Sequence, residues 1–192
     1  MFVLYAIPIG ILAGYLLGGR LDRLAGLRLR WVPLVLLGLA VQAVIFTDTG
    51  GRLVGDAGPA LYIASETAVL VAVLRNIRVP GVAVIAIGAG CNLAAIVANG
   101  GFMPADPAAM ASIGGLPPGH INSDIVEHAA RLPLTDQFAL PSWLPFANVF
   151  SVGDVLIGVG VAVTIILAMR AKPVWPTDRD RDGSGASSPS RR

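Results

Sequence analysis

Five long runs of apolar residues, separated by short polar segments, dominate the pattern along the chain. An α-helix of about 20 residues crosses the roughly 30 Å hydrocarbon layer of a bilayer, and these runs approach or reach that length. A soluble helical protein is the alternative, but runs this long would then need a very large core. The pattern therefore predicts an all-α integral membrane bundle of five transmembrane helices, over Phe2–Gly19, Val32–Thr47, Ala60–Leu74, Val79–Ala98 and Ser151–Met169.

The runs divide the chain into four parts. Residues 1–98 are expected to form four membrane helices, residues 99–150 an extracytoplasmic cap of short helices, and residues 151–170 the fifth helix. Residues 171–192 alternate in charge and then become rich in Gly, Ser and Pro. That composition is typical of disorder, so we expect a disordered cytoplasmic tail.

The Lys and Arg residues lie mostly on one side of the predicted bundle. Segments 20–30, 75–78 and 170–192 hold four, two and six of them, whereas segments 48–59 and 99–150 hold one each. Cytoplasmic loops of membrane proteins are enriched in Lys and Arg. The distribution therefore predicts that the N-terminus lies outside and the C-terminus inside, with an inner face that attracts anionic lipid.

The composition agrees with a membrane location. Hydrophobic residues make up 55% of the chain and charged residues 14%, against about 25% charged residues in typical soluble domains. The bilayer is the expected partner, and nothing predicts a nucleic-acid partner or a cofactor. One Lys against thirteen Arg favours a GC-rich bacterial source, and hence the cytoplasmic membrane of a bacterium. The single cysteine, Cys91, excludes an internal disulfide and is expected to pack as a small residue.

Three glycines recur every four residues in the first run: Gly10, Gly14 and Gly18. This spacing lets the backbone of a second helix approach closely. We therefore expect this face to contact a partner helix, either in the same chain or in another copy.

The cap segment, residues 99–150, is long for a connection and holds half of the fourteen prolines. Connections of this length usually fold or carry function. Asp106 followed by Pro107 predicts the N-cap and first residue of a short helix, which Gly114 and Gly115 would end.

A second short helix is predicted to start at Asp124, which with Glu127 resembles a capping box. His120 and His128 lie four residues on either side of Asp124 and raise the question of a metal site. The capping signal leaves His120 outside the helix, however, and the spacing matches no established ligand motif. We expect no metal here, with surface histidines as the main interpretation and pH sensing as an alternative.

Two acids, Glu66 and Asp154, lie inside the apolar runs, where a charge costs about 2.5–3.5 kcal/mol at the centre of a bilayer. Because successive runs alternate in direction, both acids and several amides fall in the outer half of the predicted bundle. We expect an outward-facing polar pocket beneath the cap. The alternative is a set of separate interhelical hydrogen bonds, with Asp154 capping its own helix. The candidates for lining the pocket are Gln42, Asn92, Asn99 and Ser151.

Two stretches, NGGFMPAD (99–106) and NVFSVGDVLIGVG (148–160), flank the cap. In this order they resemble an uncharacterised family of multi-pass bacterial membrane proteins, known as a domain of unknown function. The resemblance covers nearly all of the chain except the tail. It implies no activity.

A second, more local resemblance concerns FSVGDVLIGVG (150–160), which is similar to the last motif of signal peptidase II, F-N-x-A-D before an apolar span. This resemblance implies that Asp154 is one of two catalytic aspartates. GCNLAAIVANGG (90–101) is similar to the G-N-x-x-D-R motif of that family, but Ala95 and Ile96 replace its aspartate and arginine. Ser151 likewise replaces the asparagine of the last motif. Asp154 would then need another partner, for which Glu66 and Asp136 are candidates.

Three functional classes remain open at this point, and no activity can be assigned. The first is a binding or scaffold component whose ligand is a lipid or lipopeptide. The second is a membrane-embedded aspartyl hydrolase similar to signal peptidase II, with Asp154 and Glu66 as catalytic candidates. The third is a small-solute or proton pathway through the same two acids, although the inner halves of the runs carry no acid or amide to continue it.

Overall fold

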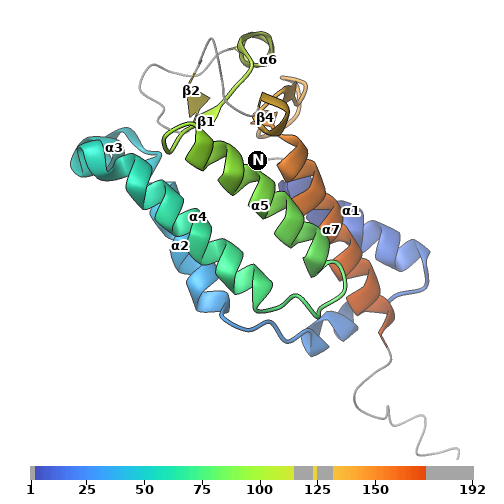
Figure 1. Cartoon of the computed structure of the whole chain (residues 1–192). Coiled ribbons are helices and arrows are strands. Elements are labelled where there is room, and N and C mark those ends of the chain that lie inside the picture. The colour runs from blue at the N-terminus through green and yellow to red at the C-terminus, as the bar shows by residue number, and fades with distance from the viewer. Residues whose placement is uncertain (1–2, 115–122, 125–131, 172–192) are drawn as a thin grey trace, which may run out of the picture.

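The computed structural model describes residues 3–114, 123–124 and 132–171 (Figure 1). Within this part of the chain the fold is all-α, as predicted, with seven α-helices and three short 3₁₀ turns. The turns are η1 (Leu21–Gly26), η2 (Gly55–Ala57) and η3 (Leu132–Leu134). The helices are α1 (Val3–Leu16), α2 (Val32–Ile45), α3 (Asp48–Val54), α4 (Gly58–Leu74), α5 (Val82–Ala98), α6 (Pro107–Ser112) and α7 (Val152–Arg170).

The five longer helices pack in the spatial order α1, α7, α5, α4, α2, which differs from their order in the chain. The C-terminal helix α7 therefore lies between α1 and α5 (Figure 1). The cap lies over one end of the bundle, and the connections 17–31 and 75–81 lie at the other end (Figure 1). Two of the Arg-rich segments, 20–30 and 75–78, thus lie at the end opposite the cap.

Two continuous helical segments are long and apolar enough to cross a membrane among the described residues: Asp48–Leu74, with 27 residues, and Val152–Arg170, with 19. The other three apolar helices, α1, α2 and α5, have 14, 14 and 17 residues. A 14-residue helix is only about 21 Å long, which is less than the thickness of a hydrocarbon layer. The sequence predicts five crossings, and helix length and composition identify two candidates.

The predicted spans differ from the helices mainly at their ends. The first helix stops at Leu16 instead of Gly19, because Gly18 adopts a left-handed conformation with φ of +76°. The fourth begins at Val82 instead of Val79, since Gly81, with φ of +89°, precedes it. Local backbone geometry, rather than hydropathy, sets these ends.

Helix α3 is absent from the sequence prediction. The Thr47 side chain accepts a hydrogen bond of 3.0 Å from the Gly50 amide and so caps the N-terminus of this helix. Its sequence, DTGGRLV, contains two glycines and has no helical periodicity of apolar residues. The cap residue was the only local signal for α3.

The glycine stripe of α1 faces a helix of the same chain. A Cβ atom on Gly10 would lie 3.0 Å from the Cα of Ala162, and one on Gly14 would overlap the side chain of Met169. Both neighbours belong to α7. Gly18 lies beyond the end of α1 and has no atom within 4 Å of its would-be Cβ, so it takes no part in this contact.

The cap contains helix α6 as predicted: Asp106 caps it by accepting a hydrogen bond of 2.8 Å from the Ala109 amide. Two small sheets, each of two two-residue strands, were not predicted. In the first, β1 (Met103–Pro104) pairs in parallel with β2 (Ser123–Asp124). In the second, β3 (Phe138–Ala139) pairs antiparallel with β4 (Val149–Phe150). These sheets hold the end of α5 and the start of α7 to the middle of the cap.

Several sequence predictions fall outside the described residues. They are the second cap helix beyond Asp124, the possible metal ligands His120, Glu127 and His128, and the tail from residue 172. Asp124 itself is described only as part of β2.

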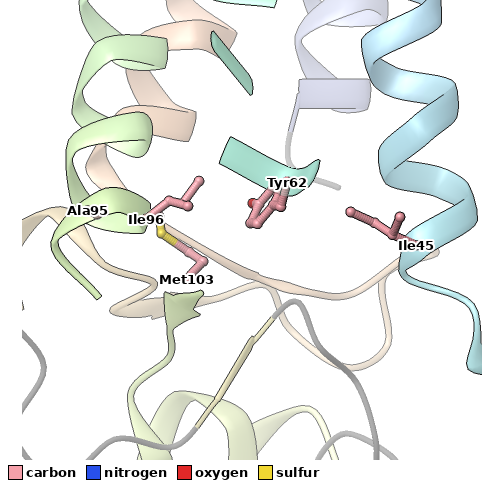
Figure 2. Packing of buried hydrophobic residues seen from close by; sticks show 5 residues of the cluster. All are labelled: Ile45, Tyr62, Ala95, Ile96 and Met103. Carbon is pink, nitrogen blue, oxygen red and sulfur yellow. The ribbon is translucent and has the colours of Figure 1, made fainter. Parts of the chain in front are cut away.

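A hydrophobic core lies directly beneath the cap, where α2, α4 and α5 meet β1. Its fully or nearly fully buried members are Ile45, Tyr62, Ala95, Ile96 and Met103 (Figure 2). The ring of Phe46 packs edge-on against that of Tyr62, with centroids 4.9 Å apart. This core holds the cap end of α4 against α5, and thereby positions the polar side chains described next.

Candidate functional site: a polar cluster beneath the cap

Asp154 lies in the first turn of α7, where it forms a capping box with Ser151. The Ser151 hydroxyl accepts a hydrogen bond of 3.1 Å from the Asp154 amide, and Asp154 Oδ2 accepts one of 3.0 Å from the Ser151 amide. These bonds satisfy backbone donors that the first turn of a helix leaves free. A carboxylate at this end also interacts favourably with the helix dipole. The alternative interpretation of Asp154 as a helix cap is therefore confirmed.

The capping box does not stand alone, because Asn92 of α5 joins it. The Asn92 Nδ2 donates a hydrogen bond of 3.1 Å to Asp154 Oδ1, and its Oδ1 accepts one of 2.9 Å from the Ser151 hydroxyl. Ser151 is fully buried, whereas Asn92 and Asp154 are half-buried. Three of the predicted site residues thus form one hydrogen-bonded group across the α5–α7 interface.

Glycines bring α5 and α7 close enough for this group to form. A Cβ on Gly153 would overlap the Asn92 side chain, and one on Gly88 would overlap the backbone carbonyl of Gly153. Two turns further along α7, a Cβ on Gly160 would lie 2.6 Å from the Ile85 side chain. This close approach of the two backbones is the small-residue packing found between membrane helices.

Two further acids lie within electrostatic range of Asp154. One is Glu66 of α4, a predicted site residue, and the other is Asp136 of the cap. The side chain of Tyr62, one helical turn before Glu66, lies within electrostatic range of all three acids. Asp154 of α7 therefore lies within electrostatic range of one acid from α4 and one from the cap.

Backbone pairing of the cap holds Asp136 in this position. Its amide donates to the Pro104 carbonyl (3.0 Å), and its carbonyl accepts from the Asp106 amide (2.8 Å). The residue is 8% exposed. Burial, and secondarily the negative charge of Asp154, raise the pKa of the Asp136 carboxyl to about 7. This shift favours the protonated form of Asp136 over a wider pH range than for an exposed aspartate.

The two remaining predicted amides behave differently from Asn92. Gln42 of α2 lies beside Glu66, but its buried Nε2 makes no hydrogen bond of normal geometry within the described part of the chain. Asn99 ends α5, and its Nδ2 donates to the Ala95 carbonyl of the preceding turn (2.8 Å). Gln42 thus lies within reach of the Glu66 carboxyl without a well-formed hydrogen bond from its Nε2, whereas this amide bond of Asn99 stays within its own helix.

Tyr62 is the member of the cluster that the sequence analysis missed. It lies four residues before Glu66, and side chains at that spacing share a face of a helix. Its apolar surroundings in the sequence indicated a core residue. Tyr62 is indeed a member of the hydrophobic core (Figure 2), in addition to its place near the acids.

Among the described residues, the acids of the cluster form no salt bridge. The one salt bridge formed within the described ranges, between Arg20 and Asp22, lies at the opposite end of the bundle. No group of three or more His, Cys, Asp or Glu residues within those ranges is arranged to hold a metal ion. The positions where a signal peptidase II motif would need an aspartate and an arginine, Ala95 and Ile96, are buried in the core. A pair of carboxyls in this cluster would therefore have to involve Asp136 or Glu66.

These features define a helical bundle with a folded cap over one end and a group of acids and amides at their junction. The chain belongs to DUF5317, a family of unknown function, whose match covers residues 26–166. The matched region contains α2 to α6 and most of α7, and so includes every residue of the polar cluster. No curated protein and no solved structure matches the chain.

Proposed function

We propose that this protein is a multi-pass integral membrane protein of the bacterial cytoplasmic membrane, with its N-terminus and cap outside. The outer surface of the bundle supports this location, because large apolar side chains are exposed along α1, α2 and α7. The concentration of arginines at the end opposite the cap supports the orientation. Helices α1 and α2 are short for a full crossing, and local thinning of the bilayer would accommodate them.

Within that membrane the protein acts as a binding or scaffold component, with the polar cluster as its binding site. The observation that carries this proposal is that Asp136 and Glu66 each lie within electrostatic range of Asp154, while none of the three acids forms a salt bridge within the described part of the chain. Grouped carboxyls lower the potential around them and attract a cation. The ligand that fits is a lipid or lipopeptide bearing an ammonium group at the level of the outer headgroups.

The test is copurification of bound lipid or peptide with the full chain, read by mass spectrometry after mild detergent extraction. The double variant Glu66→Gln/Asp154→Asn is expected to lose a species that the wild type retains. A matched control is Asp48→Asn/Asp56→Asn, which removes two exposed acids near the same end of the bundle. Equal ligand content in all three proteins would contradict the proposal.

A second candidate function, an aspartyl hydrolase, is favoured by one observation: Asp136 is buried and feels the charge of Asp154. In such a reaction the Asp154 carboxylate takes a proton from water, which attacks an amide carbonyl, while protonated Asp136 donates a hydrogen bond to the carbonyl oxygen. Collapse of the intermediate breaks the C–N bond, and the amine leaves with a proton. The products are a carboxylic acid and an amine.

The hydrolase candidate predicts that Asp136→Asn and Asp154→Asn each abolish cleavage of a lipopeptide by purified protein that remains folded. Asp106→Asn, which changes an acid of the cap outside the cluster, should leave the cleavage rate within about twofold. Absence of cleavage by the wild type, or unchanged cleavage in both cluster variants, would remove this candidate and leave the binding function.

A further inference from the structure

A second polar site lies at the end of the bundle opposite the cap. A cavity of about 440 Å³ opens there between the segment before α2 and the segment after α4. Four arginines line it: Arg28 and Arg30 from the first segment, and Arg75 and Arg78 from the second. The two segments are more than forty residues apart in the chain, so only the packing of α2 against α4 assembles this group.

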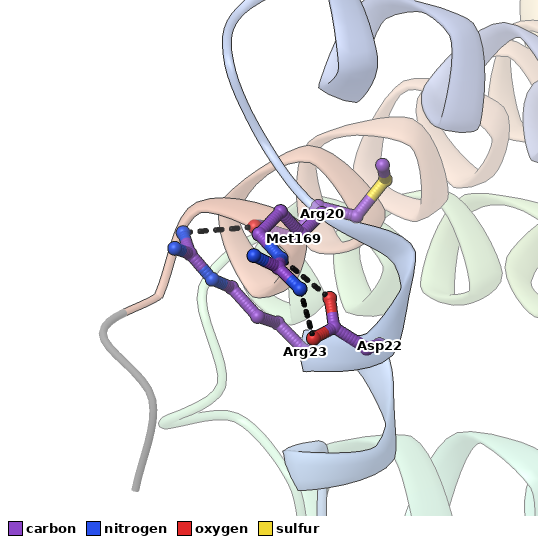
Figure 3. Close-up of polar contacts among 4 residues, drawn as sticks. All are labelled: Arg20, Asp22, Arg23 and Met169. Atoms are coloured by element: carbon purple, nitrogen blue, oxygen red, sulfur yellow. Dashed lines mark hydrogen bonds and ion pairs between the residues drawn. The ribbon is translucent and has the colours of Figure 1, made fainter. Parts of the chain in front are cut away.

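The four arginines have no carboxylate among the residues that line the cavity. In the connections 17–31 and 75–81 the only acid is Asp22. Both oxygens of Asp22 already accept hydrogen bonds of 3.1 Å from Arg20 (Figure 3). Among the described residues these four arginines therefore have no acidic partner, and their positive charges repel one another. An anion bound in the cavity would offset this repulsion.

The cavity is held in shape by Asn76, which is 9% exposed. The Asn76 Nδ2 donates to the Arg30 carbonyl (2.7 Å) and to the Ala72 carbonyl (2.8 Å), while its Oδ1 accepts from the Arg30 amide (2.7 Å). These bonds fix the backbone of one arginine-bearing segment to the end of α4. The guanidinium of Arg75 lies over the Trp31 ring, 6.0 Å from its centroid, which restrains a second arginine.

The chemistry of the lining selects phosphate. Guanidinium groups bind phosphate oxygens through paired hydrogen bonds, and several of them together suit an anion with more than one free oxygen. The rim of the cavity is apolar and exposed: Leu74 is 49% exposed and Ile77 is 43% exposed. A soluble anion would gain nothing from such a rim, whereas the glycerol and acyl chains of a phospholipid would lie against it.

We propose that this arginine-lined cavity binds the phosphate group of an anionic phospholipid from the cytoplasmic leaflet. Basic pockets between membrane helices on that side are suited to anionic headgroups. The assignment to lipid rests on the membrane location proposed above, but it does not depend on the polar cluster under the cap. The site would anchor α2 to α4 at the inner surface.

The test measures binding of phosphatidylglycerol to the purified full chain in neutral detergent micelles, by native mass spectrometry and by Trp fluorescence. The variant Arg75→Gln/Arg78→Gln is expected to weaken binding by about tenfold or more. Both side chains are exposed, so folding should be unaffected. The control Arg23→Gln/Arg170→Gln removes two charges from the same end outside the cavity and should stay within about twofold of the wild type.

Three outcomes would overturn the proposal. An equal loss of lipid binding in the two variants would show that the lipid responds to the net charge of this end of the bundle and not to a specific site. Equal binding of phosphatidylglycerol and the zwitterionic phosphatidylcholine, which share the same phosphodiester, would show that the cavity does not select an anionic lipid. Inorganic phosphate that competes at the same concentration as the lipid would identify a soluble ligand instead. If the chain did not partition into membranes at all, the proposed location would fail separately from this site.

Discussion

Asn92 on α5 donates a hydrogen bond of 3.1 Å to Asp154 on α7, across 62 residues of sequence. With the Ser151 amide on the other oxygen, both oxygens of Asp154 accept hydrogen bonds. The carboxylate therefore has a structural role whatever else it does. Any loss of function in an Asp154 variant has to be compared with its effect on folding.

The first prediction concerns this hydrogen-bonded group. Asn92→Ala removes a donor to Asp154 and an acceptor of Ser151, and should lower the free energy of unfolding by about 1–3 kcal/mol. Ser151→Ala, which removes the cap, should cost about 1 kcal/mol. Because the residues share partners, the double variant should cost less than the sum, as measured by denaturation in detergent. Strict additivity would mean that Asn92 acts independently of the cap.

The second prediction concerns the approach of α5 and α7. Gly153→Ala introduces a methyl group that overlaps the Asn92 side chain, so it should lower the unfolding free energy by about 1–3 kcal/mol. The control is Gly90→Ala on α5, whose new Cβ would have no atom within 4 Å. It should be neutral or stabilising by up to about 1 kcal/mol, because alanine favours the helix. Similar melting temperatures for the two variants would contradict this account of the interface.

The third prediction concerns pH. The pKa of Asp136 is about 7 in the folded protein, against about 3.9 in the unfolded chain. At a pH between these two values, Asp136 is protonated in the folded state and ionised in the unfolded state. Stability should therefore fall as pH rises from about 4 to 7, by at most about 4 kcal/mol, and level off above. Thermal melting as a function of pH measures this. Asp136→Asn, which cannot ionise, should flatten the slope; the same slope in the variant would assign the effect to another group.

The fourth prediction concerns Gln42, whose buried amide nitrogen lacks a hydrogen bond among the described residues. Replacing it by leucine removes that unpaired donor, so Gln42→Leu should raise the unfolding free energy by about 1 kcal/mol in the absence of ligand. The control is Gln137→Leu, which breaks a bond of 2.7 Å to the Thr135 hydroxyl and should be destabilising. A destabilised Gln42→Leu would show that the amide has a partner in solution.

The fifth prediction tests the proposed orientation. In a Cys91→Ala background, Ser112→Cys in the cap should react with a membrane-impermeant thiol reagent in intact cells. Arg78→Cys, at the opposite end of the bundle, should react only after the cells are opened. The reverse pattern would invert the topology, and with it both the outward position of the polar cluster and the inner position of the arginine-lined cavity.

Local patterns predicted the parts of this fold that depend on local physics. The five apolar runs correspond to helices, because a helix of this composition satisfies its own backbone hydrogen bonds and needs only an apolar surrounding. Asp106 before Pro107 located α6, since a cap and a preset φ act within one turn. The ends at Gly18 and Gly81 were misplaced, because hydropathy does not report a left-handed backbone conformation.

The sequence by itself determined the helical class, the gathering of positive charge on one side and the position of Asp154 at the start of the last helix, since each depends on composition or on neighbours along the chain. Only the tertiary structure decided that α7 lies between α1 and α5, that Asn92 reaches Asp154, and that buried Asp136 lies within its electrostatic range. It also decided that arginines from two connections line one cavity. Contacts between distant segments depend on the distance between two backbones and on the rotation of each helix about its axis. Packing over the whole interface sets both quantities, and the hydrophobic pattern of a single segment does not reveal them.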